Sequence, residues 1–270
     1  MQQKRLVTIQ DLSCFGKCSI SVALPVISAL GHETVVLPTA VLSTHTGGFK
    51  DYTFFEFTDE FEKIQEHWYC MGLEFDAIYV GYIGSVRLIE AVEAFIDRFR
   101  KNAVVFIDPA MADNGLFYSG LDSEYSQRLS KLLKKADIIS PNYTEALILA
   151  GYSPDEKGIE LKDIFEKLSP ICKNVIVTGV HDDNNIITAS KEISGEIKKA
   201  VRPFTEGSFY GSGDLFASAF IGLYLKGLSL ENAVEKATSF VSECIEKTLD
   251  EREKYCYGLK FEQCLGMLTL

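Results

Sequence analysis

The sequence predicts an α/β protein, a three-layer α/β/α sandwich in which helices cover both faces of a mostly parallel central sheet. Two observations lead to this fold class. Short β-favouring runs alternate with longer stretches whose apolar residues recur three and four positions apart, the spacing of an amphipathic helix. The short runs are almost continuously apolar, as expected for parallel strands buried on both faces.

Six apolar runs are expected to form strands of this sheet. The first, RLVTI, lies close to the start of the chain, and the others follow at intervals long enough for a helix. The runs occupy residues 5–9, 34–39, 77–84, 103–110, 136–142 and 174–180.

Helices are expected between these strands. The first, at 19–31, ends on Gly31, a residue type that commonly follows the last turn of a helix. The segment LFASAFIGLYLKG at 215–227 is apolar nearly all round and predicts a buried helix. Further helices, each with one apolar stripe, are predicted at residues 87–102, 123–136, 144–151 and 161–174.

The segment at 43–60 departs from this alternation, because it is polar and aromatic with paired glycines. It predicts either an irregular flap or a small strand addition. No linker rich in Pro, Gly or Ser divides the 270 residues, so we expect a single domain over 1–270.

Composition excludes several classes of function. The net charge of −11 and the lack of a basic patch disfavour a nucleic-acid partner. No stretch approaches the roughly 20 apolar residues needed to span a bilayer, and the start lacks the apolar core of a signal peptide. We therefore expect a cytoplasmic protein whose seven cysteines are reduced thiols.

Polar residues follow the predicted strands, where ligands bind in open parallel sheets. They are the candidates for a functional site. In chain order they are Asp11, the segment 39–48, Tyr82, Asp108 with Asp113, Asn142 with Glu145, and Thr178.

The sequence GSGD at 211–214 precedes the predicted buried helix. The first amides of a helix lack partners within it, and its dipole places partial positive charge there, so an anion is expected at this end. Gly211 and Gly213 would let the backbone approach a phosphate closely, and Ser212 adds a hydroxyl donor. Asp214 has two interpretations: a simple N-cap, or a base that deprotonates an alcohol while the amides hold the transferred phosphoryl group.

Familiar nucleotide motifs are absent. FGKCS at 15–19 lacks the remaining residues of a Walker A loop, and Phe216 replaces the third glycine of a dinucleotide fingerprint.

Carboxylates and an amide elsewhere are candidates for a magnesium site, since magnesium needs only one or two carboxylates besides water and phosphate. These residues are Asp108, Asp113, Asn142 and Glu145. In the alternative interpretation, Asp113 belongs to a turn, and Asn142 or Thr144 caps the next helix.

The ordered set of motifs resembles the ribokinase-like superfamily, and within it the pyridoxal and pyridoxamine kinases. The resemblance extends from Leu6 to about Ile245 and is carried by STHTGG, GYIGS, DPAMADNG, SPNYTEA, VTG and GSGDLFASA. It implies transfer of the ATP γ-phosphate to the 5′-hydroxymethyl group of a B6 vitamer with Mg²⁺. It also implies a homodimer and allows for a monovalent cation such as K⁺.

By this resemblance, Asp214 is the general base and the preceding three residues form the anion hole. The acceptor would contact Asp11, Thr46, Gly47 and Tyr82. The nucleotide would contact Asp108, Asn142, Glu145 and Thr178, and the metal ion would contact Asp113 and Glu145.

The chain departs from the family pattern at three positions. Asp11 replaces a serine found in many pyridoxal kinases, Thr44 replaces an asparagine, and Gly48 replaces an aromatic residue. These changes leave the preferred vitamer open, and a hydroxymethylpyrimidine or another small alcohol remains an alternative substrate. A non-catalytic sensor of vitamers is a further alternative, because fold alone does not fix function.

Overall fold

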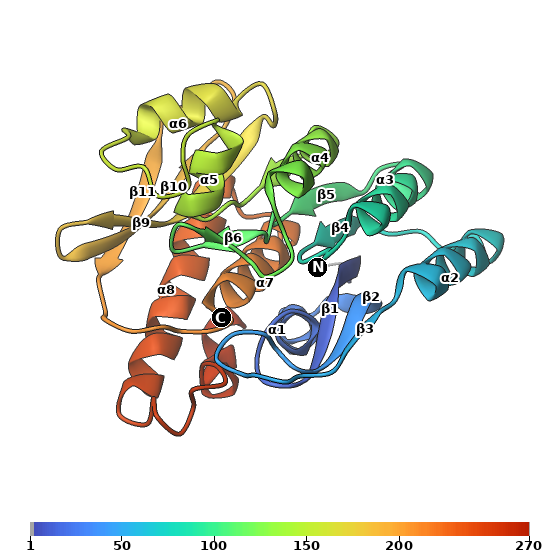
Figure 1. Cartoon of the computed structure of the whole chain (residues 1–270), viewed down its shortest axis with the longest axis horizontal. Helices are drawn as coiled ribbons and strands as arrows, with labels where there is room; N and C mark the ends of the chain where they lie inside the picture. The colour runs from blue at the N-terminus through green and yellow to red at the C-terminus, as the bar shows by residue number, and fades with distance from the viewer. Residues whose placement is uncertain (1–2, 270) are drawn as a thin grey trace.

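The computed structural model describes residues 3–269 and contains one nine-stranded sheet (Figure 1). Its six central strands, from β2 to β9 in spatial order, are parallel, and antiparallel pairs add β3 at one edge and β10 with β11 at the other. In spatial order the strands are β11 (Lys198–Pro203), β10 (Asn185–Lys191), β9 (Asn174–Asp182), β8 (Ile138–Ile139), β5 (Val104–Ile107), β4 (Ala77–Val80), β1 (Arg5–Phe15), β2 (Glu33–Thr44) and β3 (Phe54–Glu56).

Helices cover both faces of this sheet, so the predicted three-layer α/β/α fold is confirmed. Figure 1 shows α7 and α8 on the side of the sheet opposite to α3, α4 and α5. One layer contains α2 (Thr58–Cys70), α3 (Val86–Phe99), α4 (Ser123–Leu133), α5 (Tyr143–Leu149) and α6 (Leu161–Leu168). The other contains α1 (Ile20–Ala29), α7 (Ser212–Leu225) and α8 (Leu230–Leu249).

Strand β4 shows why the strands are apolar throughout. All four of its residues are buried. Ile78 and Val80 pack under the layer of α2 to α6, whereas Ala77 and Tyr79 pack under α1, α7 and α8. Successive side chains point to opposite faces of a strand, so a sheet covered on both faces requires apolar residues at every position.

The six expected strands and the expected helices are present, with shifted ends. The predicted helix at 161–174 ends at Leu168, because Pro170 disfavours helical geometry in the residue before it and lacks an amide. The segment 43–60 forms a strand addition: β2 continues to Thr44, and β3 returns antiparallel beside it.

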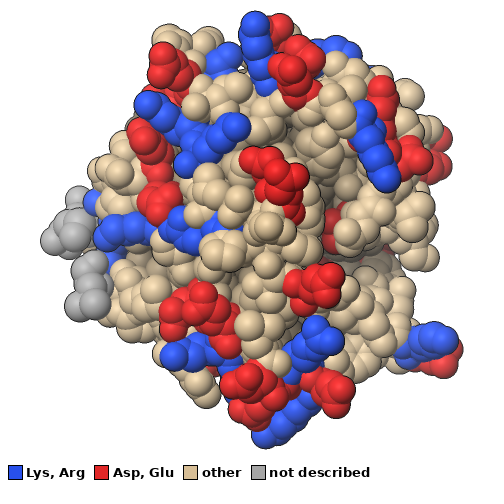
Figure 2. All heavy atoms as spheres, turned by 90° about the vertical axis from the view of Figure 1, so that its left-hand side faces the viewer, with Lys and Arg blue, Asp and Glu red and all other residues tan. Residues whose placement is uncertain are grey.

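Two short accessory regions lie near the ends of the parallel strands and near the C-terminus. A small hairpin is formed by β6 (Ala112–Asp113) and β7 (Leu116–Phe117). Two 3₁₀ turns, η1 (Phe261–Gln263) and η2 (Leu265–Leu268), follow α8. Among residues 3–269, no helix combines the length and apolar character needed to cross a membrane. On the face in Figure 2, Lys and Arg side chains are interspersed with Asp and Glu.

Candidate active site

Helix α7 begins inside the GSGD sequence. Gly211 is its N-cap and adopts a left-handed conformation with φ of 78°, which glycine tolerates best. Ser212 donates its amide to the Phe209 carbonyl at 3.2 Å. The amides of Gly213 and Asp214 are therefore the ones in the first turn that could donate hydrogen bonds to an anion. The helix is buried from Leu215 to Leu223, as predicted. Because Asp214 is the third helical residue, the simple N-cap interpretation of Asp214 is wrong.

The Asp214 carboxylate lies among other acidic groups. Its pKa is raised to about 7, chiefly by burial and also by the nearby Asp11 carboxylate, whereas a hydrogen bond from the Ser19 amide opposes the shift. A carboxylate whose pKa lies near neutrality is suited to accept a proton from an alcohol.

Asp11 lies at an irregularity of β1. The pairing register with β2 shifts between Gln10 and Leu12, and such bulges redirect side chains near functional sites. Its buried carboxylate accepts hydrogen bonds from the hydroxyls of Ser13, at 3.0 Å, and Ser19. Burial raises the pKa of Asp11, and the two serine hydroxyls oppose that shift.

Glu145 holds the β6–β7 hairpin against the start of α5. One carboxylate oxygen accepts the amides of Met111 and Ala112 at 2.9 and 3.3 Å, and the other accepts the Asn142 amide at 2.8 Å. The Asn142 side chain in turn accepts the Glu145 amide at 2.9 Å and donates to the Ala112 carbonyl at 2.7 Å. These bonds form a capping box, so the predicted alternative in which Asn142 caps a helix is confirmed.

Asp108 connects this cluster to Asp214. Its pKa is raised by burial first, and then by the carboxylates of Glu145 and Asp214, while Ser140 opposes the shift. Several negative charges therefore converge at the carboxyl ends of the strands, which is favourable only if protons or cations neutralise them.

Asp113 is the last residue of β6 and leads into the turn formed by Asn114 and Gly115, in agreement with its alternative interpretation. It accepts the backbone amide and the side-chain amide of Asn114, both at 2.9 Å. Asn114 and Gly115 both have positive φ, 51° and 78°, as a two-residue hairpin loop requires. Among residues 3–269, no group of three or more His, Cys, Asp or Glu side chains is arranged to hold a metal ion.

The remaining candidates lie around these carboxylates. The Tyr82 phenol has a pKa raised to about 12, first by burial and then by Asp11. Gly47 packs on the Tyr210 ring, since a β-carbon at Gly47 would lie 2.4 Å from that ring. Thr46, between His45 and Gly47, is exposed.

Thr178 lies on β9 beside the start of α5. Its amide donates to the Pro141 carbonyl at 3.0 Å, and it pairs with Asn142 through a parallel bridge. The two predicted nucleotide contacts are thus neighbours.

Several residues at this site were not predicted. Tyr118 is the clearest, because burial and four surrounding carboxylates raise the pKa of its phenol. Those carboxylates belong to Glu145, Asp113, Asp108 and Asp214. Ser19 and Cys18 lie within FGKCS, a signal considered only as a Walker loop, and no sequence pattern indicated Tyr118.

A parallel α/β sandwich with a glycine-capped buried helix and converging carboxylates at its strand ends defines a kinase of the ribokinase-like superfamily. The chain belongs to the phosphomethylpyrimidine kinase family, whose model matches residues 15–257.

Solved structures and curated relatives agree with this assignment. One solved structure is that of a Bacteroides thetaiotaomicron protein, provisionally assigned as a phosphomethylpyrimidine kinase and crystallised with pyridoxal. Its sequence is 32% identical to this chain, and the TM-score is 0.92. The match covers 99% of this chain and 96% of the Bacteroides chain. Pyridoxal kinase from Lactobacillus plantarum is 27% identical, with a TM-score of 0.93 over 99% and 97% of the two chains. The pyridoxal kinase of Dictyostelium discoideum is 24% identical over 289 residues, covering 97% of this chain and 94% of its own.

Proposed function

We propose that this protein transfers the γ-phosphate of ATP to the 5′-hydroxymethyl group of a B6 vitamer. The observation that carries the proposal is the position of Asp214. It lies in the first turn of α7, beside the amides that would hold an anion, and its pKa is raised to about 7. The Bacteroides thetaiotaomicron protein crystallised with pyridoxal supports a pyridine alcohol as acceptor.

In this mechanism Asp214 removes the proton of the acceptor hydroxyl. The acceptor oxygen then forms a bond to the γ-phosphorus, and the bond between that phosphorus and the bridging oxygen breaks, with its electron pair leaving on ADP. The amides of Gly213 and Asp214, together with the Ser212 hydroxyl, stabilise the charge of the transferred group. The protein supplies position and charge stabilisation rather than a covalent intermediate.

The acceptor would lie between β1 and the segment after β2. The Asp11 carboxylate lies close enough to Tyr82 to help raise the pKa of its phenol. Gly47 lies against Tyr210, the residue that precedes Gly211. We assign acceptor contacts to Asp11, Tyr82, Gly47 and the exposed Thr46. We assign nucleotide contacts to Asp108, Asn142, Glu145 and Thr178.

The donor set fits a divalent cation such as Mg²⁺ held together with triphosphate oxygens. The converging charges of Asp108, Glu145 and Asp214 favour a cation. Asp108 is the direct carboxylate candidate, whereas Glu145 already accepts three amides and Asp113 accepts two hydrogen bonds from Asn114. We therefore assign Glu145 and Asp113 to the metal site through bridging water. When bound, the cation neutralises negative charge on the triphosphate.

Phosphorylation of hydroxymethylpyrimidine is the second candidate function. The matching family model is described as phosphomethylpyrimidine kinase, and a Bacillus subtilis relative that is 26% identical over 249 residues is named hydroxymethylpyrimidine/phosphomethylpyrimidine kinase. The homodimer, the K⁺ requirement, the cytoplasmic location and the single-domain organisation stay predictions.

Vitamer-dependent release of ADP tests the proposal. Purified protein is assayed with MgATP and, separately, pyridoxal, pyridoxamine, pyridoxine and hydroxymethylpyrimidine. We expect a B6 vitamer to give the highest kcat/KM. A higher value for hydroxymethylpyrimidine would transfer the assignment to the second candidate. Binding of vitamers without release of ADP would identify a non-catalytic sensor and contradict the proposal.

A further inference from the structure

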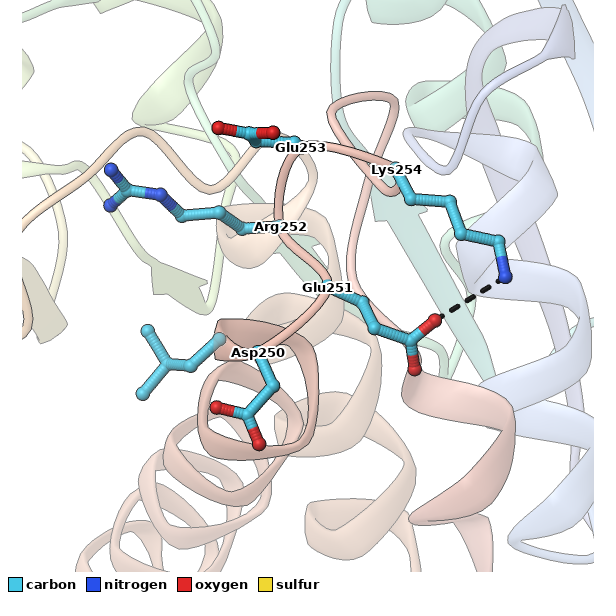
Figure 3. A pocket seen from close by; sticks show the side chains of 6 residues that line it. Asp250, Glu251, Arg252, Glu253 and Lys254 are labelled. Atoms are coloured by element: carbon cyan, nitrogen blue, oxygen red, sulfur yellow. Dashed lines mark hydrogen bonds and ion pairs between the residues drawn. The ribbon is translucent and has the colours of Figure 1, made fainter.

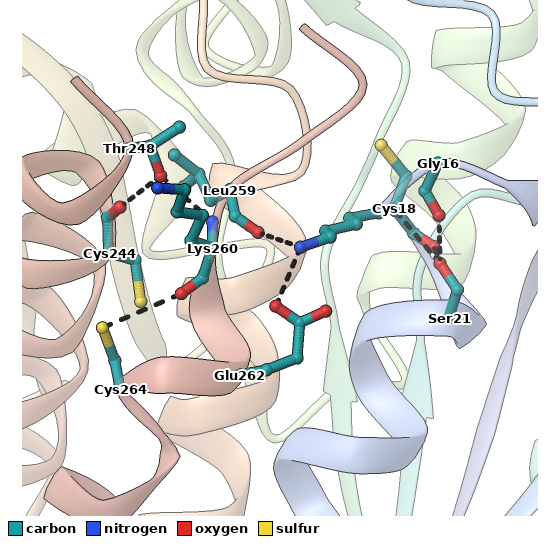
Figure 4. Close-up of polar contacts among 10 residues, drawn as sticks. Gly16, Cys18, Ser21, Cys244, Thr248, Leu259, Lys260, Glu262 and Cys264 are labelled. Carbon is teal, nitrogen blue, oxygen red and sulfur yellow. Dashed lines mark hydrogen bonds and ion pairs between the residues drawn. The ribbon is translucent and has the colours of Figure 1, made fainter. Parts of the chain in front are cut away.

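Lys17 belongs to the Gly-Lys pair of FGKCS, but its side chain contacts the C-terminal segment. Its ammonium donates to the Leu259 carbonyl at 2.9 Å and to the Glu262 carboxylate at 2.8 Å, and its side chain is only 16% exposed. Figure 4 shows these two acceptors beside the loop that contains Gly16 and Cys18. The cation is therefore paired and largely removed from water.

Aromatic rings complete the surroundings of the Lys17 ammonium. The ring centroids of Tyr255, Tyr257 and Phe261 lie 5.5, 6.0 and 5.4 Å from the nitrogen, within the range of cation–π attraction. Gly258 allows this close approach, because a β-carbon there would lie 2.5 Å from the Lys17 β-carbon. Three aromatic residues and one glycine of the C-terminal segment thus surround the Lys17 side chain.

The C-terminal segment is itself fixed to α8. Lys260 pairs with Glu251, and its amide donates to the Thr248 hydroxyl at 3.0 Å. That hydroxyl donates to the Cys244 carbonyl at 2.7 Å (Figure 4). Figure 3 shows Lys254 paired with the same Glu251 carboxylate. The C-terminal segment that binds the Lys17 side chain is therefore fixed to α8 by several independent contacts.

The backbone of the Gly16–Ser19 loop connects this anchor to the proposed site. The Lys17 amide donates to the Tyr257 carbonyl at 2.9 Å, and the Lys17 carbonyl lies directly against Gly211. Two residues further on, Ser19 donates its hydroxyl to Asp11 and its amide to Asp214. One short loop thus contacts both the proposed acceptor-binding carboxylate and the proposed base.

Local geometry shows that the loop needs such support. Ser19 has a positive φ of 52°, which is unfavourable for a residue other than glycine. The Ser21 hydroxyl donates to the carbonyls of Gly16, at 3.0 Å, and Cys18, at 2.7 Å, and accepts the Cys18 amide at 3.2 Å. These bonds hold the turn internally, whereas the Lys17 side chain ties it to the rest of the molecule.

We propose that Lys17 is a positioning residue: it anchors the Gly16–Ser19 loop to the segment Tyr255–Glu262 and so fixes Asp11 and Asp214 for phosphoryl transfer. This inference rests on the proposed function but assigns a role to a lysine and a C-terminal segment that are not among the proposed substrate contacts.

Kinetics of Lys17→Met test this role. The side chain keeps its length but loses the charge, so we expect kcat to fall about tenfold or more and the KM for the vitamer to rise, since small displacements of catalytic groups are costly. The KM for ATP should change less than the KM for the vitamer, because the loop bonds to the acceptor-side Asp11 through Ser19 and reaches the phosphoryl-binding turn only through the backbone contact with Gly211. Lys17→Arg keeps the charge and N–H donors for the Leu259 carbonyl and the Glu262 carboxylate, so it should recover more activity than Lys17→Met retains.

Lys247→Met is the matched control, because the 54% exposed Lys247 side chain forms a surface ion pair with Glu243 on the same helix, α8. It should behave as wild type. If Lys17→Met keeps wild-type kinetics, or raises both KM values equally without rescue by Lys17→Arg, the positioning role is refuted. Glu262→Leu, at a 54% exposed side chain, provides a second variant should Lys17→Met not fold, and it should reproduce the selective change in smaller degree.

Amide hydrogen exchange separates this inference from the proposed function. If wild type releases no ADP with any vitamer, the proposed function fails, but the anchor can still be measured. Faster exchange of the amides at 16–21 and 211–214 in Lys17→Met than in Lys247→Met would support the anchor. Equal exchange in the two variants would overturn it.

Discussion

The Lys17 carbonyl oxygen lies 1.9 Å from the point that a β-carbon on Gly211 would occupy. The turn after β1 therefore fits against the start of α7 only because residue 211 has no side chain. This contact brings the loop at 16–19 and the GSGD sequence, nearly two hundred residues apart in the chain, into one site.

Gly211→Ala should destabilise the protein and abolish turnover. The new methyl group would collide with backbone rather than with a flexible side chain, and a left-handed conformation costs an additional 1–2 kcal/mol or so for alanine. Denaturant unfolding and the ADP-release assay measure the two effects. Gly227→Ala is the matched control: φ is also positive, at 92°, but its β-carbon would meet no atom of residues 3–269 within 4 Å. Equal stability of the two variants would contradict the importance of the Lys17 contact.

Asp11→Ser should change the order in which the three vitamers are preferred. A buried carboxylate favours a cationic substituent, so we expect pyridoxamine to lose most, about tenfold in kcat/KM for one charge-assisted hydrogen bond. Ser13→Ala removes one donor to Asp11 without removing its charge and serves as control. Identical vitamer profiles in wild type and Asp11→Ser would exclude Asp11 from specificity.

Asp214→Asn should stabilise the protein at pH 8. The folded-state pKa of Asp214, about 7, exceeds its ordinary value of 3.8, so the folded state binds more protons between these values, and stability falls as pH rises through that window. At about 1.4 kcal/mol per pKa unit the shift corresponds to at most about 4 kcal/mol, and because the Asp214 residue is half-buried, solvent screening makes the measured cost smaller.

Urea unfolding at pH 8 and pH 5 measures this difference. The gain from Asp214→Asn should be largest at pH 8 and shrink at pH 5, where folded Asp214 is already protonated. A gain that does not depend on pH would show that Asp214 has an ordinary pKa.

Much of the fold could be predicted because the signals are local. Residue spacing within a short window predicts the apolar strands and the helices that have one apolar stripe. It also predicts the helix after GSGD, which is apolar nearly all round. Helices α2 and α8 and strands β10 and β11 were not predicted. In α2 and α8 polar residues outnumber the buried ones, and the β10–β11 pair lies at a sheet edge with weaker apolar patterning.

The site was predicted less completely, because its remaining parts depend on contacts between distant segments. Asp108 lies at the end of a predicted strand, and Asp214 directly precedes a predicted helix. The locations of both residues could therefore be inferred from the sequence. The role of Ser19 depends on a left-handed backbone and on the bulge at Asp11, and the placement of Tyr118 depends on the hairpin held by Glu145. None of these leaves a periodic pattern in the sequence.

Turnover of Asp214→Asn tests the central claim most directly, namely that this carboxylate deprotonates the acceptor at the start of α7. Asp163→Asn is the control, because Asp163 also lies in the first turn of a helix, α6, but is exposed. Steady-state ADP release with the best vitamer should fall at least a hundredfold or so in Asp214→Asn, with ATP binding retained, and should not change in Asp163→Asn. Near-normal turnover in Asp214→Asn would contradict the account.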